Sequence, residues 1–325
     1  MKVLGINISH DASISEVVDG KVVSYYKEER FRRIKTCWSP SECFLKHTND
    51  IACIKYKCID EMVDLSTVDK VVIASHDMRG QGRARQTNRE EQIIIKELKK
   101  QVGNIPTIYE VNHHLYHAFC GTYFSNFNDA ICIIMDGGGA KLYPSHKELG
   151  ELESVYTYEN GVFTRKFVRM GPLEDIVNYE TSPEDYQREI DDVSSGVEID
   201  FDEHYRSGAQ KFADLSVGLG FLGGQGSGKV MGLAAYAQND RQWADKTLAK
   251  KLQEETFLQS VELIKKAISY STSKNIVLSG GYALNCTNNY RYTQEFPEYN
   301  FFVDPCAYDG GTAMGAALWG YYDNK

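Results

Sequence analysis

The feature that most constrains the fold is a pattern that occurs twice. In each copy a short apolar segment ends in small or acidic residues, and a β-hairpin follows. The first copy begins with VLGINI at residues 3–8, and its hairpin turns at Asp19-Gly20. Such a pair between two β-rich segments is a strong hairpin signal, because both positions tolerate a positive φ. The second copy begins with DAICIIMDGGGAKL at residues 129–142 and turns at Asn160-Gly161. The sequence therefore predicts a duplicated α/β unit.

The remaining segments fit this α/β reading. Further strands are predicted at 69–75, 275–279 and 301–303, and helices at 39–52, 89–102, from 113, at about 208–236 and 241–270, and from Thr312. We expect two lobes with a nucleotide between them, formed by residues 1–125 and 126–325. The acidic stretch 174–206 has few aliphatic residues, and a solvated, partly helical insertion is favoured there over a substrate-facing cap.

Composition narrows the class of protein. The 325 residues suffice for two cores, and the net charge of −9 disfavours binding to nucleic acid. No apolar run is long enough to cross a bilayer, and the first residues are not typical of a signal peptide. Eight cysteines without a CxxC pair are typical of reduced thiols, so we expect a cytoplasmic protein with no membrane association.

The stretch VNHHLYHAFCG, at residues 111–121, contains three histidines. On a helix, His113 and His117 point to one face at a spacing that a metal ion can bridge. Two aspartates beside glycines, Asp136 and Asp309, make a site of two histidines and two carboxylates a hypothesis. That mixture favours iron(II), zinc or manganese over calcium. Purely structural histidines remain the alternative that spacing leaves open.

Two glycine loops follow predicted strands. Glycines let backbone N–H groups approach an anion closely, and a strand-to-helix junction suits a nucleotide on the helix N-terminus. Asn285 could then reach a ribose or a base, while tight turns and close packing are the alternatives. The loop residues that we assign to a nucleotide are Gly137, Gly138, Gly139, Gly280 and Gly281.

The stretch GGQGSGKV, at residues 223–230, has the GxxxxGK spacing of a P-loop. Val230 stands where that motif needs Ser or Thr as a magnesium ligand, so the P-loop reading is rejected. Lys229 is kept as a predicted phosphate contact.

These motifs, in this order, resemble the NodU/TobZ-type O-carbamoyltransferases and, more distantly, the TsaD-type tRNA threonylcarbamoyl transferases. The resemblance covers nearly the whole chain, through GINISHDAS, EERFRRIK, HHLYHA, MDGGG, GKVMGLAAY, LSGGYALNC and DGGTAMGAAL. It implies the actin-like, sugar-kinase-like ATPase (ASKHA) fold, with two lobes around a nucleotide cleft. It also implies that His113, His117, Asp136 and Asp309 hold a metal, often iron, at the nucleotide phosphate. Magnesium is left open, and Gly232 joins the predicted nucleotide contacts.

The resemblance further implies a reaction. An acceptor hydroxyl of a small metabolite or a nucleotide attacks the carbamoyl carbon of carbamoyl-adenylate, and AMP leaves. We expect His10 to act as general base and Asp11 to orient it, with a hydrogen-bonded strand-end histidine as the alternative. Relatives carry a YrdC-like C-terminal domain that makes carbamoyl-adenylate from ATP and carbamoyl phosphate. This sequence ends at Lys325 without one, so we expect a YrdC-like partner to supply the donor.

Two other functions stay open at the level of sequence. One is a non-catalytic nucleotide-binding subunit of a split carbamoyltransferase. The other is a TsaD-like tRNA threonylcarbamoyl transferase, which the acidic composition disfavours. A homodimer is neither required nor excluded.

Overall fold

The computed structural model describes residues 1–33, 55–75, 89–110, 112–142, 149–172, 196–221, 223–237 and 244–323. The chain divides into two compact units. The first comprises Met1–Cys120, Ala140–Tyr143 and Tyr308–Lys325, and the second comprises Gly121–Gly139 and Pro144–Ala307. The predicted helix at 39–52 and residues 174–195 of the predicted acidic insertion lie outside the described residues.

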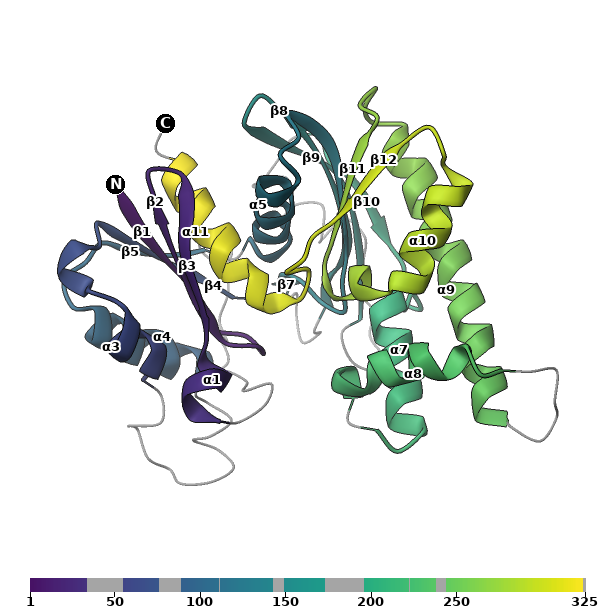
Figure 1. Cartoon of the computed structure of the whole chain (residues 1–325), viewed down its shortest axis with the longest axis horizontal. Coiled ribbons are helices and arrows are strands. Elements are labelled where there is room, and N and C mark those ends of the chain that lie inside the picture. Colours follow the sequence, from purple (N-terminus) through teal and green to yellow (C-terminus); the bar gives the residue numbers. More distant parts are fainter. Residues whose placement is uncertain are drawn as a thin grey trace. The chain divides into compact units, whose positions relative to one another are not determined.

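The first unit is built on a five-stranded sheet in the order β3-β2-β1-β4-β5 (Figure 1). Strands β1 to β3 are antiparallel, whereas β4 and β5 run parallel to β1. The hairpin between β2 and β3 is confirmed, with positive φ at Asp19 and Gly20. The strands are β1 (Lys2–Asn7), β2 (Ser13–Val18), β3 (Lys21–Lys27), β4 (Lys70–Ala74) and β5 (Thr107–Glu110).

Helices cover both faces of this sheet because alternate residues of each strand point to opposite sides. Leu4 and Ile6 share a core with residues of α3 (Lys57–Met62) and α4 (Arg89–Val102). On the other face, Gly5 lies so close to α11 (Thr312–Tyr322) that a Cβ would come within 2.0 Å of the carbonyl oxygen of Ala313. The unit also contains α1 (Glu28–Arg32), η3 (Leu65–Thr67), η6 (Asp309–Gly311), β7 (Lys141–Leu142) and most of α5 (His113–Ser125).

The packing of α11 alters the predicted division of the chain. The sequence placed all of residues 126–325 in the second lobe. The structure instead returns Tyr308–Lys325 to the first unit, because Gly5 and the small residues of α11 allow close helix–sheet packing. The other predicted boundary, after residue 125, lies near the observed one at Gly121.

The second unit contains a sheet in the order β10-β9-β8-β6-β11-β12. Five of these strands, β9-β8-β6-β11-β12, repeat the order and directions of the first sheet, which confirms the predicted duplication. Strand β6 is thus the counterpart of β1. The strands are β6 (Asp129–Met135), β8 (Leu149–Glu159), β9 (Val162–Pro172), β10 (Glu198–Phe201), β11 (Asn275–Ser279) and β12 (Asn300–Val303).

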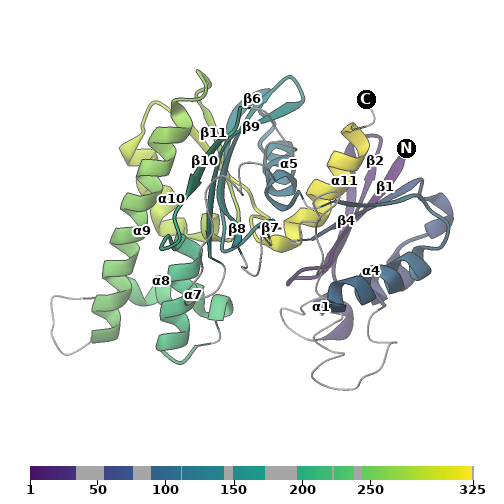
Figure 2. The same cartoon turned by 180° about the vertical axis from the view of Figure 1, so that it is seen from behind.

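One face of the second sheet is covered by helices that Figure 2 shows from behind. Alternate residues of β6, such as Ile131 and Ile133, form a core with them. On the opposite face, the last turn of α5 packs closely, since a Cβ at Gly121 would meet Val277 at 2.8 Å. The helices are α7 (Gly208–Gly218), η4 (Gly223–Gly226), α8 (Ser227–Ala234), α9 (Ala244–Ile268), η5 (Gly281–Leu284) and α10 (Cys286–Glu295).

Two sequence predictions for this unit are corrected. The helix expected at 208–236 is interrupted between α7 and α8, because Gly220 adopts a φ of 79° and Gly226 approaches Ser216 too closely for any side chain. The stretch 196–206 was expected to be solvated and partly helical, but it contains β10, which pairs with β9. Among the described residues, no helix is both long enough and apolar enough to cross a membrane.

Candidate functional site

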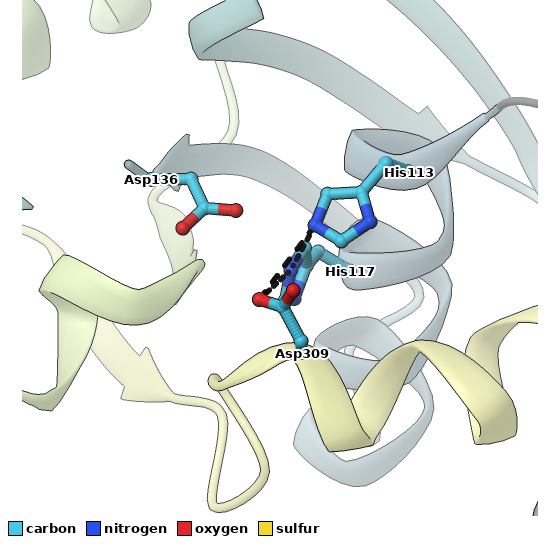
Figure 3. Close-up of side chains that lie close together, drawn as sticks. All are labelled: His113, His117, Asp136 and Asp309. Carbon is cyan, nitrogen blue, oxygen red and sulfur yellow. Dashed lines mark hydrogen bonds and ion pairs between the residues drawn. The ribbon is translucent and has the colours of Figure 1, made fainter. Parts of the chain in front are cut away.

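The histidine pair stands in the first turns of α5, which begins at His113. His113 and His117 are one helical turn apart, and neither has exposed surface. Their Nε2 atoms lie 3.2 Å apart, with the rings edge to face (Figure 3). Two nitrogens that each bind one metal ion at about 2 Å are separated by roughly 3 Å. The pair is therefore already spaced for a shared ion.

Asp309 is the carboxylate of the first unit that faces this pair. It opens η6 ahead of α11 and is 1% exposed. Its Oδ1 lies 3.8 Å from His113 Nε2 and 4.0 Å from His117 Nε2, the contacts dashed in Figure 3. Its Oδ2 accepts a hydrogen bond of 2.9 Å from Ser9 Oγ and lies 3.1 Å from His10 Nε2. One carboxylate thus divides its two oxygens between the histidine pair and the loop after β1.

That loop presents His10, whose side chain is 40% exposed. His10 Nδ1 lies 3.1 Å from Asp11 Oδ2, and Asp11 takes the left-handed conformation, with φ at 61°. Asn7 fixes the turn, since its Nδ2 donates to the carbonyl oxygen of His10 and its Oδ1 accepts from Ser9. The structure therefore brings the predicted base and its predicted orienting residue into contact.

The charge state of Asp11 follows from its neighbours. Burial works to raise the pKa of its carboxyl group, but hydrogen bonds from His10 and Lys27 outweigh burial and hold that pKa below its ordinary value. Lys27 Nζ donates to Asp11 Oδ1 at 2.9 Å. Asp11 is consequently a carboxylate at neutral pH, and its Oδ2 faces Nδ1 of His10 while Asp309 Oδ2 faces Nε2.

A divalent transition metal suits the buried donors of this unit. A buried carboxylate and two imidazoles, with ligand atoms within 4.8 Å of one another, form a set of nitrogen and oxygen donors. Two histidines and one carboxylate are a set that iron(II) and zinc accept. Taking an ionised carboxylate out of water is costly unless a cation or a donor compensates it. The residues present therefore fit the predicted metal.

Asp136, also drawn in Figure 3, belongs to the second unit and directly follows β6, the counterpart of β1. It is 6% exposed, and its Oδ1 accepts from the backbone N–H groups of Gly137 (2.7 Å) and Gly281 (3.2 Å). Gly280 has a φ of 88°, and a Cβ there would lie 2.4 Å from the carbonyl oxygen of Met135. Both predicted glycine loops thus meet at Asp136. Glycine is required at position 280 because of its positive φ and its close approach to Met135.

The other predicted nucleotide contacts lie on different elements. Asn285 caps α10 by accepting from Asn288 N and exchanges side-chain hydrogen bonds with Gln253, so it already has a structural role. Lys229 is exposed on α8, with Nζ 5.1 Å from the centre of the Phe221 ring, and Gly232 lies one turn further along that helix. Gly138 and Gly139 follow Gly137 in its loop.

Comparison with known proteins places these features in a family context. Residues 247–318 match the family described as carbamoyltransferase N-terminus. The chain is 23% identical over 337 residues to the nodulation protein NolNO of Sinorhizobium fredii, covering 95% of this chain and 46% of that protein. It is 25% identical to the uncharacterized protein sll1178 of Synechocystis, covering 98% of this chain and 57% of that protein. The chain is thus similar to a carbamoyltransferase family and to a nodulation protein. It spans about half the length of these relatives.

Solved structures agree on the fold. A ROK family protein from Streptococcus pneumoniae, in complex with sucrose, aligns with a TM-score of 0.54 at 10% identity over the whole of both chains. A ROK family glucokinase from Streptomyces griseus, in complex with glucose and AMPPNP, aligns with a TM-score of 0.52 at 15% identity, over 98% of this chain and 99% of that one. The chain therefore has the ASKHA fold that its motifs predicted.

Sequence reasoning missed two residues of the site. Ser9 was passed over, although it stands directly before His10, and its hydroxyl joins Asn7 to Asp309. Lys27 was also missed, because only the pairing of β3 with β2 brings it opposite Ser13 and next to Asp11.

Proposed function

We propose that this protein transfers a carbamoyl group from carbamoyl-adenylate to a hydroxyl group of a small metabolite or a nucleotide. The observation that carries the proposal is the position of Asp309. Its Oδ1 faces the His113–His117 pair, and its Oδ2 faces His10. This arrangement supports the proposal, because it brings the histidine proposed as base next to the side chains proposed to ligate a metal. The relation to carbamoyltransferases supports the reaction class.

The proposed metal is iron(II) or another divalent transition metal. His113, His117 and Asp309 would hold it, and Asp136 is the fourth ligand that the resemblance implies. When bound, such an ion neutralises negative charge that develops on a leaving phosphate oxygen.

His10 is the proposed base. As the acceptor oxygen bonds to the carbamoyl carbon, the proton of that hydroxyl passes to Nε2 of His10. The bond between the carbamoyl carbon and the phosphate oxygen breaks, and AMP departs with its electron pair. Asp11 holds Nδ1, while Asp309, whose Oδ2 lies 3.1 Å from Nε2, stabilises the imidazolium by accepting from the newly formed Nε2–H. The carbamoylated product, AMP and the proton held by His10 account for every atom of the two substrates.

The proposed reaction also requires a source of carbamoyl-adenylate. We place the synthesis of carbamoyl-adenylate from ATP and carbamoyl phosphate outside residues 1–325, in a YrdC-like domain or protein. The two glycine loops, whose Gly137 and Gly281 N–H groups hold Asp136, are the part of this chain proposed to contact the adenylate.

The test supplies synthetic carbamoyl-adenylate and a panel of hydroxylated acceptors to the wild type, His10→Gln and His204→Gln. His204 is an exposed histidine of the second unit and serves as the matched control. Mass spectrometry of AMP and carbamoylated product should show equal activity for wild type and control. For His10→Gln we expect a fall of roughly 10²- to 10⁴-fold, the usual contribution of a general base. Full activity of His10→Gln would overturn its role. Inertness of the wild type across the panel would favour a non-catalytic nucleotide-binding subunit.

A further inference from the structure

Lys27, the last residue of β3, is half-buried among groups that the proposed reaction uses or that adjoin them. Its side chain is 17% exposed, and its Nζ lies 2.9 Å from Asp11 Oδ1 and 3.3 Å from Glu29 Oε1. The same ammonium lies 4.6 Å from the centre of the Tyr308 ring, a distance that permits a cation–π interaction.

The contact with Asp11 reaches His10 through a single carboxylate. Asp11 gives Oδ1 to Lys27 and Oδ2 to His10 Nδ1. A carboxylate held at one oxygen by a fixed cation has less rotational freedom at the other. The imidazole bonded to it is therefore held in one tautomer and one plane, as when an outer carboxylate orients a functional histidine.

The contact with Tyr308 reaches the opposite side of His10. Tyr308 directly precedes Asp309, and its hydroxyl lies 3.0 Å from that of Tyr25, which is two residues before Lys27. Asp309 in turn faces His10 Nε2. One end of β3 thus contacts both segments that flank the imidazole, namely the loop carrying Asp11 and the segment leading to Asp309.

We propose that Lys27 is a positioning residue, which acts through Asp11 to hold the His10 ring with Nδ1–H toward Asp11 and Nε2 on the side of Asp309. This inference rests on the proposed function, because the base role of His10 is what gives the orientation a purpose. Lys27 itself does not contact the reacting atoms in this assignment.

Three variants test the proposal. Lys27→Met removes the charge but keeps the length of the side chain, whereas Lys27→Arg keeps a cationic donor for Asp11. Lys2→Met is the matched control, because Lys2 forms a comparable, mostly buried ion pair with Glu16 on the same sheet, at 2.6 Å. We expect Lys27→Met to lower kcat roughly 10- to 100-fold with KM within about twofold, as for other outer partners of functional histidines. Lys27→Arg should recover most of kcat, and Lys2→Met should change neither constant. A KM defect alone, or no recovery by arginine, would overturn the proposal.

A second measurement does not depend on turnover. Nitrogen NMR of histidine-labelled, EDTA-treated protein at mildly alkaline pH reports which ring nitrogen of His10 carries the proton, with His10→Gln identifying the signal. We expect the Nδ1–H form in wild type, Lys27→Arg and Lys2→Met, and a mixture of tautomers in Lys27→Met. An unchanged tautomer in folded Lys27→Met would refute positioning. If the wild type shows no transfer, the proposed function fails while this spectrum still decides the role of Lys27. Lys27→Gln replaces Lys27→Met if the latter does not fold.

Discussion

Replacing Gly315 with alanine should disturb the candidate metal centre without changing any of its ligands. Gly315 lies in α11, and an ideal Cβ there would come within 1.9 Å of the carbonyl oxygen of Tyr116, next to His117 in α5. Ordinary contact begins at 3.4 Å, so the two helices must separate by 3.4 − 1.9 = 1.5 Å. Because the obstacle is backbone, no side-chain rotation relieves it. Overpacking costs about 1–3 kcal/mol, and we expect a loss of about 3 kcal/mol in the free energy of unfolding.

Urea unfolding measures that loss, and metal analysis of the folded protein measures its effect on the site. Because Asp309 lies in η6, which leads directly into α11, a shift of this size should lengthen the distances from Asp309 to His113 and His117 and lower metal occupancy. Gly228→Ala in α8 is the matched control, since a Cβ there meets nothing within 4 Å. It should leave the protein equally stable or up to about 1 kcal/mol more stable, because alanine favours a helix. A wild-type urea midpoint for Gly315→Ala would refute the close α5–α11 packing.

Three further predictions concern single groups. Glu28→Gln should lower the free energy of unfolding in urea by about 3–5 kcal/mol. The reason is that this fully buried carboxylate pairs with Arg32 and accepts from the first N–H groups of α3. A free energy of unfolding equal to that of the wild type would contradict this prediction. Burial works to raise the pKa of Asp11, but hydrogen bonds from His10 and Lys27 outweigh it and lower that pKa. The ionised form of Asp11 therefore stabilises the fold fully at pH values above the ordinary carboxyl pKa of about 3.9. That stability should be lost as pH falls through the folded pKa, and Asp11→Asn should show a flatter acid limb in pH-dependent unfolding. Gly281→Val should weaken AMP binding by roughly tenfold in calorimetry, because a Cβ there lies 3.3 Å from Asp136 Oδ1; unchanged affinity would place the nucleotide elsewhere.

Local signals predicted much of the fold. The turns at Asp19-Gly20 and Asn160-Gly161 were identified because both residues of each pair adopt positive φ, a preference that the residue types carry themselves. The helix predicted at 89–102 coincides with α4, because its apolar positions follow the helical period. Short strands escaped notice, since β5 and β10 have four residues each and give little periodicity.

Features that depend on packing between segments far apart in the sequence were not predicted. The return of α11 to the first sheet depends on the space that Gly5 leaves, which no local pattern reports. Lys27 illustrates the same limit within the site. Counting from the turn at Asp19-Gly20 pairs Ser13 with Tyr26, but a one-residue irregularity at Glu16 shifts the register, so that Ser13 pairs with Lys27. For His113, His117 and Asp309, residue type and spacing offered a metal site as one hypothesis and the family resemblance favoured it; the structure brings the three side chains together.

The central claim is that the cluster of His113, His117 and Asp309 holds a metal that carbamoyl transfer requires. The most direct measurement determines metal content and transfer from synthetic carbamoyl-adenylate on the same preparations of wild type, His117→Ala and His114→Gln. His114 is equally buried on α5 but points to a different side of that helix, so it controls for the loss of a buried histidine. The account predicts one transition metal per wild-type chain, parallel loss of metal and transfer in His117→Ala, and retention of both in His114→Gln. Full metal content in His117→Ala, or undiminished transfer by metal-free wild type, would contradict it.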